Sequence, residues 1–483
     1  MLFPLIVRSV GAYNYGLWLA TGEAISYVLL GDLGVFAVLP WLVAGRIGAN
    51  DFDSLRKLLA NAITIGSIIG GLLLVFCFVA LSLNPSQFGI PATVWNVIFF
   101  PTILLLGLNG LGYPFRAFSA LLIGAQDVLF LGLLSALQSV LLLILTVVMI
   151  VSDSGIPGLA LATGLPPLLV SVIAFLRTLW KHPYTLRGMS QPDFSGCLTL
   201  FREGFGAWLS GLGVRMMAAS NGIILASVGK PEWATVYASS GKISQILSPM
   251  CSTIPDNGLV GVSHVHASND GERTRRSVVC LVLLYTIIPS FAAIALLVAN
   301  PAFVSWWIGP ELYAGHYVNI LTAISVVIAG VAGGLLKLVS VVGLRQTVGW
   351  STVVAGVSYA LLGYILVRWH GLVGLAEATL CVWLGILFPI GTYLIFKVYE
   401  VRLSDFMAVG AGRWLCITLA FIVIASVIGI QLAHFPFLAF TASLACIGIY
   451  GLLLRPTLAL APWPANVRHW LCRLRVIPDL TCP

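Results

Sequence analysis

Three basic residues stand inside long apolar stretches of this chain, where ionisable side chains are rare. They are Arg215, Lys242 and Lys337. A cation in apolar surroundings is costly unless it meets an anion, so we treat all three as candidates for contacting a negatively charged group. For Arg215 and Lys242 the alternative is an ion pair that holds helices together. For Lys337 the alternative is a side chain that extends toward lipid headgroups.

Other ionisable residues could form the mouth of a cavity or drive conformational change. Arg116, near the end of an apolar stretch, is either a residue at a cavity mouth or a determinant of membrane topology. The coupling or gating candidates are the acidic residues Glu23, Asp32 and Glu377. Glu23 could bind a proton or sodium ion, or pair with a cation such as Lys242. Asp32 lies about 180° from Glu23 around an ideal helix, so both line one cavity only if the glycine-rich stretch 31–34 distorts that helix.

We expect neither a metal site nor a cofactor. His264 and His266 have no third ligand nearby in the sequence, and the nine cysteines show no C-x-x-C spacing, which favours thiols in an apolar core. No glycine-rich loop of the P-loop kind is present in the sequence, which argues against direct drive by ATP.

The composition shows what must position these residues. Of the 483 residues, 59% are hydrophobic and only 9% are charged, against roughly 25% charged in soluble domains. Apolar runs of about 20 residues recur along the whole chain, as a bilayer requires of spanning helices. We therefore predict an all-α polytopic membrane protein. The thirteen predicted spans are 15–44, 58–83, 95–121, 127–151, 156–176, 204–228, 233–260, 278–300, 316–343, 347–368, 371–396, 411–431 and 434–454.

The basic residues predict the topology. Of the 25 Lys and Arg residues, 19 fall in one set of alternate loops and helix ends, three in the opposite set and three inside spans. This asymmetry predicts a cytoplasmic C-terminus. The same sorting of basic residues to one side explains the net charge of +8, so the charge does not indicate a nucleic-acid partner. The apolar segment from Leu2 to Val10 rises only about 14 Å as a helix. We therefore expect a first span that is largely truncated, and fourteen spans with both ends cytoplasmic if it were restored.

An internal repeat predicts two lobes. At an offset of 218 residues, Ser9-Val10-Gly11 falls on Ser227-Val228-Gly229 and Tyr15 falls on Trp233. An even number of spans separates the copies, which predicts parallel repeats with a cavity between them and rocking between inward-open and outward-open states. The expected parts are an N-terminal lobe at 1–180, a cytoplasmic linker at 181–203, a C-terminal lobe at 204–397, and two further helices with a tail at 398–483.

Several short motifs resemble one family. The segments Pro4 to Gly11, Tyr15 to Trp18 and Asp32-Leu33-Gly34, with Leu122 to Gln126 and Trp307 to Glu311, resemble the pattern of polysaccharide flippases. That family belongs to the superfamily that also holds lipid II flippases and multidrug and toxic compound extrusion transporters. The chain departs from the pattern in lacking nearly all of the first helix.

The resemblance implies a fold and a function. The expected fold is fourteen helices, arranged as two six-helix lobes plus two added helices. The expected activity is transport of undecaprenyl-pyrophosphate-linked oligosaccharides across the bacterial inner membrane, where Arg215, Lys242 and Lys337 would contact the pyrophosphate. Membrane lipids and other polysaccharide-assembly proteins would be its partners, with no nucleic acid.

Two other classes of protein compete with this interpretation. A cation-coupled multidrug exporter of the same fold would favour a cavity dominated by carboxylates, whereas here the basic residues expected to be buried equal or exceed the acidic residues expected to be buried. A membrane enzyme, such as a polysaccharide polymerase or glycosyltransferase, would need a large extracytoplasmic loop with acids or arginines. The predicted exterior loops are short and poor in charge, so we do not expect an enzyme.

Overall fold

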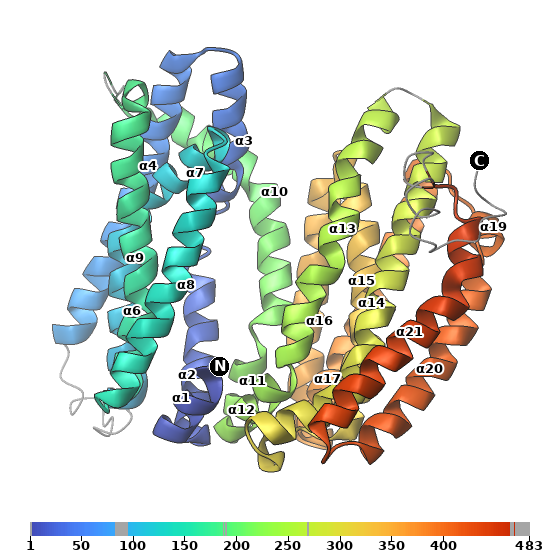
Figure 1. Ribbon diagram of the computed structural model, residues 1–483. Helices are drawn as coiled ribbons and strands as arrows, with labels where there is room; N and C mark the ends of the chain where they lie inside the picture. Colours follow the sequence, from blue (N-terminus) through green and yellow to red (C-terminus); the bar gives the residue numbers. More distant parts are fainter. Residues whose placement is uncertain are drawn as a thin grey trace. The chain divides into compact units, whose positions relative to one another are not determined.

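The computed structural model describes residues 2–82, 95–186, 188, 191–267, 270–463 and 468. These residues form helices and turns and contain no strand. They fall into two compact units, the first up to Ala234 and the second from Thr235 (Figure 1). The predicted lobes and linker have different boundaries, because they rest on the sequence repeat. They remain a prediction.

The first unit is built from α-helices joined by short irregular helices. Its elements are α1 (Leu2–Val10), α2 (Ala12–Val28), α3 (Val35–Gly48), α4 (Phe52–Ser82), η2 (Trp95–Phe99), α6 (Phe100–Gly112), η3 (Tyr113–Phe115), α7 (Arg116–Gly124), α8 (Val128–Val151), α9 (Gly155–Lys181), η4 (Pro183–Thr185), α10 (Phe194–Ala218), α11 (Asn221–Ser227) and the start of α12 (Pro231–Ser240). Helices α4, α6, α9 and α8 pack in succession (Figure 1). Leu39, Leu55, Leu59 and Leu121 form the centre of its core, fully buried between α3, α4 and α7.

The second unit is organised around one long helix. Its elements are the end of α12, then α13 (Lys242–Ala267), α14 (Gly271–Trp307), η5 (Pro310–Leu312), α15 (His316–Val341), α16 (Arg345–His370), α17 (Leu372–Val382), η6 (Trp383–Leu387), α18 (Phe388–Tyr399), α19 (Leu403–Ala408), α20 (Ala411–Gln431) and α21 (Pro436–Leu460). Helix α14 contacts α13, α15, α20 and α21. It is apolar on nearly every side beyond its first turns, which is typical of a helix buried among others.

The two C-terminal helices belong to the core of the second unit. Tyr450 on α21 is fully buried and shares a hydrogen bond of 2.8 Å with Thr418 on α20. Gly429 on α20 lies directly against the backbone of Leu297 on α14, where a Cβ would collide with the Leu297 carbonyl. A side chain at position 429 would push α20 away from α14.

The lengths and hydropathy of the helices confirm an all-α polytopic membrane protein. Ten described helices are long and apolar enough to cross a membrane, and the pair α10 and α11, bent by 48°, makes eleven. The two other predicted spans, 15–44 and 233–260, are each divided into two helices. The first is interrupted between α2 and α3, and the second at Gly241, where the following helix α13 is rich in polar residues.

Candidate functional site

The first predicted span is broken where its glycines cluster. Residues 29–34 form turns between α2 and α3, and Leu33 and Gly34 adopt left-handed φ values of 48° and 81°. Such a break frees backbone carbonyls, which must find donors within the protein because lipid offers none. The Tyr113 hydroxyl donates to the Leu29 carbonyl at 2.8 Å, and the indole Nε1 of Trp208 donates to the Leu30 carbonyl at 2.8 Å. The Leu29 carbonyl is thereby satisfied, and the Leu30 carbonyl, which also accepts from the backbone N–H of Leu33 at 3.2 Å, gains a second donor.

A second break lies between α10 and α11, and α2 supplies the groups that satisfy it. The backbone N–H of Ile223 donates to Oε2 of Glu23 at 2.9 Å. The Tyr27 hydroxyl and the Ser220 hydroxyl lie 2.6 Å apart in a hydrogen bond. Each broken span therefore stabilises the other, because Trp208 of α10 bonds the end of α2 while Glu23 and Tyr27 of α2 bond the start of α11.

Small residues let the two broken spans approach closely. A Cβ at Gly204 would lie 2.8 Å from backbone atoms of Leu33 and Gly34. A Cβ at Gly222 would lie 3.0 Å from the backbone of Ala20 and from the Glu23 carboxylate. Gly204 on α10 and Gly222 on α11 thus lie at close contacts between helices in the first unit.

Arg215 lies in the last turn of α10, just before the second break. Its side chain is exposed, and among the described residues it has no ion pair within 4 Å. It is near enough to the Tyr27 hydroxyl to interact with it electrostatically. Two predicted site residues therefore lie at one helix break. Arg215 comes just before the break, and the Glu23 carboxylate of α2 binds the backbone just after it.

Asp32 and Arg116 both lie near enough to Tyr113, close to the first break, to interact with it electrostatically. The Asp32 carboxylate is buried and accepts a hydrogen bond of 3.3 Å from the backbone N–H of Phe36, at the start of α3. The Arg116 guanidinium lies over the Tyr113 ring, 4.0 Å from its centroid. Arg116 also lines a small cavity of about 30 Å³ together with Asn109 and Ser171. Asp32 thus stabilises the restart of the helix.

The second unit holds an ion pair between residues of two predicted spans. Nζ of Lys337 on α15 lies 2.9 and 2.8 Å from the two carboxylate oxygens of Asp256 on α13. The Tyr285 hydroxyl on α14 donates to the same carboxylate at 2.6 Å. The side chains of Lys337 and Asp256 keep 43% and 35% of their exposure, so the pair is only partly buried. Gly334 allows this arrangement, since a Cβ there would collide with the Tyr285 ring.

The sequence missed the partner of Lys337. Asp256 lies near the predicted cytoplasmic end of its span, where we expect a solvated side chain. Its side chain is partly exposed, and it also pairs with Lys337. The sequence does carry one indication of a partner. Asp256 follows Pro249 and Pro255 inside a predicted span, and an acidic residue inside a span needs a partner. Nothing in the sequence identifies Lys337 or Tyr285 as those partners, because both lie on other helices.

The two remaining predicted site residues lie elsewhere in the second unit. Glu377, early in α17, is 2.5 Å from Nδ1 of His370 at the end of α16. Lys242, at the start of α13, donates to the Gln245 side chain at 3.2 Å.

Comparison with known proteins places the chain within a fold. No protein-family model matches the sequence, and no curated protein matches it significantly. One similar solved structure is described as the inward-facing conformation of a multidrug resistance MATE family transporter of the MOP superfamily. It has a TM-score of 0.66 at 15% identity and covers 82% of this chain and 94% of its own. An outward-facing structure with the same description has a TM-score of 0.58 at 17% identity, covering 83% and 95%.

A third similar structure is a MOP superfamily transporter from Pyrococcus furiosus Vc1, for which a reverse polarity of the binding pocket suggests a different function. Its TM-score is 0.55 at 17% identity, covering 83% of this chain and 90% of its own. At these identities the likeness shows the fold alone. The chain thus shares the fold of solved MATE and MOP superfamily transporters.

Proposed function

We propose that this chain is an alternating-access membrane transporter whose substrate carries an anionic head. The substrate class we favour, from the resemblance of the sequence motifs to those of polysaccharide flippases, is a lipid-linked oligosaccharide, flipped across the bacterial inner membrane for polysaccharide synthesis. The fold supports transport, since structures of this fold have been solved in inward-facing and outward-facing conformations. Broken helices support it as well, because transporters place substrate and ion sites where membrane helices are discontinuous.

The observation that supports an anionic substrate is that the acidic groups inside the predicted spans already accept hydrogen bonds or form ion pairs. All five acidic residues inside the predicted spans already have a donor. They are Glu23, Asp32, Asp127, Asp256 and Glu377. A cationic substrate would have to displace one of these donors. Arg215, by contrast, is exposed and has no ion pair among the described residues, so an anionic group could bind it without breaking an existing contact.

The second candidate is cation-coupled multidrug export. The descriptions of the similar structures support this candidate more directly than they support a flippase, because two of them are multidrug resistance transporters. In that case Glu23 would bind the coupling cation or proton. Its carboxylate would then exchange the amide of Ile223 for the ion, which would loosen the break between α10 and α11.

One pair of assays separates these candidates. The chain is expressed in a bacterium that lacks its own polysaccharide flippase, where surface glycan is measured, and in a drug-sensitive strain, where resistance to cationic toxins is measured. We expect restored surface glycan, lost in Arg215→Gln but kept in Arg46→Gln, which alters an exposed arginine paired with Asp51. Drug resistance without surface glycan would overturn the flippase proposal in favour of the second candidate. Membrane abundance of each variant is measured in parallel.

A further inference from the structure

A polar cavity lies on the face of the second unit that the topology predicts to be cytoplasmic. Its volume is about 780 Å³, within the range of sites that hold small ligands. The first turns of α14, the end of α18 and the segment leading to α19 form its walls. The lining residues used below are Glu272, Arg275, Tyr399, Glu400 and Arg402.

The cavity lies at the depth of lipid headgroups. Helix α14 is charged up to Arg276 and apolar from Val278 onward, and α18 is apolar up to Phe396. This change from charged to apolar sequence marks the membrane interface. The short helix α19 exposes Leu403 by 65% and Met407 by 57%. Apolar side chains exposed beside charged ones are typical of a helix that lies in the interface.

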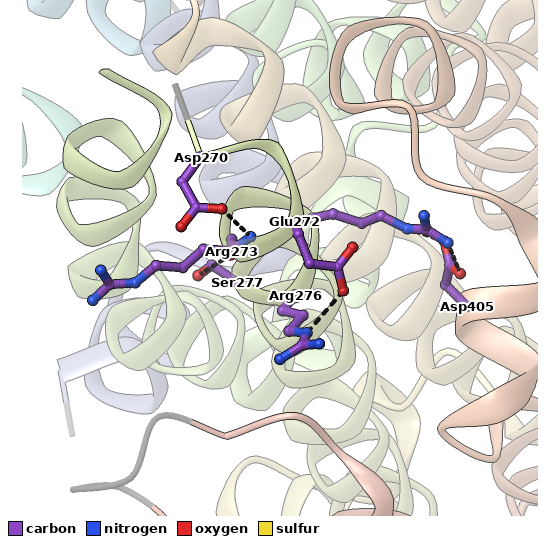
Figure 2. Close-up of polar contacts among 7 residues, drawn as sticks. Asp270, Glu272, Arg273, Arg276, Ser277 and Asp405 are labelled. Carbon is purple, nitrogen blue, oxygen red and sulfur yellow. Dashed lines mark hydrogen bonds and ion pairs between the residues drawn. The ribbon is translucent and has the colours of Figure 1, made fainter. Parts of the chain in front are cut away.

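Two of the charged groups at this cavity already have partners. The Arg275 guanidinium binds the Asp405 carboxylate through two hydrogen bonds, one of 2.8 Å from its Nε. Glu272 accepts a hydrogen bond of 2.9 Å from Arg276, one turn later on the same helix (Figure 2). Arg273 points away from Asp405 in the same view, and it does not line the cavity.

One acid and one base remain without an ion pair. Glu400 and Arg402 both line the cavity and are exposed, and neither has an ion pair within 4 Å among the described residues. Arg402 is near enough to Asp405 to interact with it electrostatically. They are separated by Val401, which is buried and anchors the segment. A ligand that satisfies both must carry a negative and a positive group a few atoms apart. A purely anionic headgroup would satisfy Arg402 but would lie beside the uncompensated carboxylate of Glu400.

We propose that this cavity binds the headgroup of a zwitterionic phospholipid, phosphatidylethanolamine. The phosphate would accept hydrogen bonds from Arg402, and the primary ammonium would donate to Glu400. Its acyl chains would enter the bilayer beside Leu403 and Met407. This inference does not depend on the transported substrate, because every residue in it lies in the second unit, away from Arg215 and Glu23 in the sequence.

The test is lipid binding to the purified full chain, measured by native mass spectrometry in detergent. Phosphatidylethanolamine, phosphatidylcholine and phosphatidylglycerol with identical acyl chains are titrated separately. Phosphatidylcholine has the same charges but no N–H donor, and phosphatidylglycerol has the phosphate without the ammonium. We expect one phosphatidylethanolamine bound about tenfold more tightly than either, equivalent to one charge-assisted hydrogen bond.

Variants assign the site. Glu400→Gln should remove the preference for phosphatidylethanolamine over phosphatidylglycerol, whereas Arg402→Gln should weaken the binding of both lipids. Lys397→Gln is the control, because this exposed lysine lies over the Tyr393 ring and does not line the cavity. Equal binding of the three lipids by the unmodified chain would overturn the proposal, as would an unchanged preference in both cavity variants. Binding that favours phosphatidylglycerol would identify a merely basic surface and would also overturn it.

Discussion

The carboxylate of Glu23 accepts a hydrogen bond of 2.9 Å from the backbone N–H of Ile223, 200 residues further along the chain. This contact joins α2 to the start of α11, where the second broken span resumes. Nearby, Tyr27 and Ser220 form a second link between the same elements. The break between α10 and α11 is therefore stabilised by a helix from a distant part of the sequence.

Removal of this carboxylate should destabilise the first unit. In Glu23→Ala the amide of Ile223 loses its acceptor, which costs about 1–3 kcal/mol for a polar group shielded from water. Glu23→Gln keeps an acceptor oxygen and should cost less. Thermal unfolding in detergent, followed by circular dichroism, measures both changes. Glu203→Ala is the control, because Glu203 is exposed on α10, and a drop in its melting temperature equal to that of Glu23→Ala would contradict the assignment.

The close approach of α10 to the first break predicts different effects for two glycines of one helix. Gly204→Ala places a Cβ 2.8 Å from the backbone of Leu33 and Gly34, which cannot move aside as a side chain can. We expect a loss of about 1–3 kcal/mol, as for other overpacked contacts. A Cβ at Gly211 meets nothing within 4 Å. Gly211→Ala should therefore be neutral or stabilising by up to about 1 kcal/mol, because alanine favours a helix.

The same thermal unfolding measurement distinguishes the two glycine variants. An equal loss for Gly204→Ala and Gly211→Ala would show that the contact with the first break does not limit stability.

The ion pair between Asp256 and Lys337 predicts non-additive substitutions. Asp256→Asn leaves the Lys337 ammonium without its anion, and Lys337→Met leaves the carboxylate with only the Tyr285 hydroxyl. Each single change should lower stability by more than the double change does, since the double variant leaves no uncompensated charge. Because both side chains are partly exposed, the coupling should stay below the several kcal/mol of fully buried pairs. Additive melting temperatures in the double-mutant cycle would show that the pair is screened by water.

The contact between Asp405 and Arg275 predicts a dependence on pH. Hydrogen bonds from Arg275 lower the pKa of the Asp405 carboxyl below its ordinary value of 3.8, although burial opposes this shift. A group whose pKa is lower in the folded state stabilises the fold above its unfolded pKa and loses that contribution as pH falls through the folded pKa. The stability difference between the unmodified chain and Asp405→Asn should thus be constant from pH 7 to about pH 5 and shrink below about pH 4.

Thermal unfolding of both forms across this range measures the difference in stability. A difference that grows as the pH falls would be inconsistent with a lowered pKa.

The sequence alone determined the class of protein and most of its spans. The bilayer imposes a simple rule, namely about 20 apolar residues in a helix, and most of the predicted spans satisfy it from local composition. Eleven of the thirteen predicted spans correspond to helices, or to a bent pair, that could cross a membrane.

Only the tertiary structure decided which partners complete the site. The sequence shows Gly31 and Gly34 but not that Tyr113 and Trp208 satisfy the carbonyls freed beside them. It places Asp256 at the end of a span, whereas the folded chain pairs this residue with Lys337 across two helices. These contacts join residues between 81 and 178 positions apart. Local propensity carries no information at such separations, because the packing of whole helices sets which side chains meet.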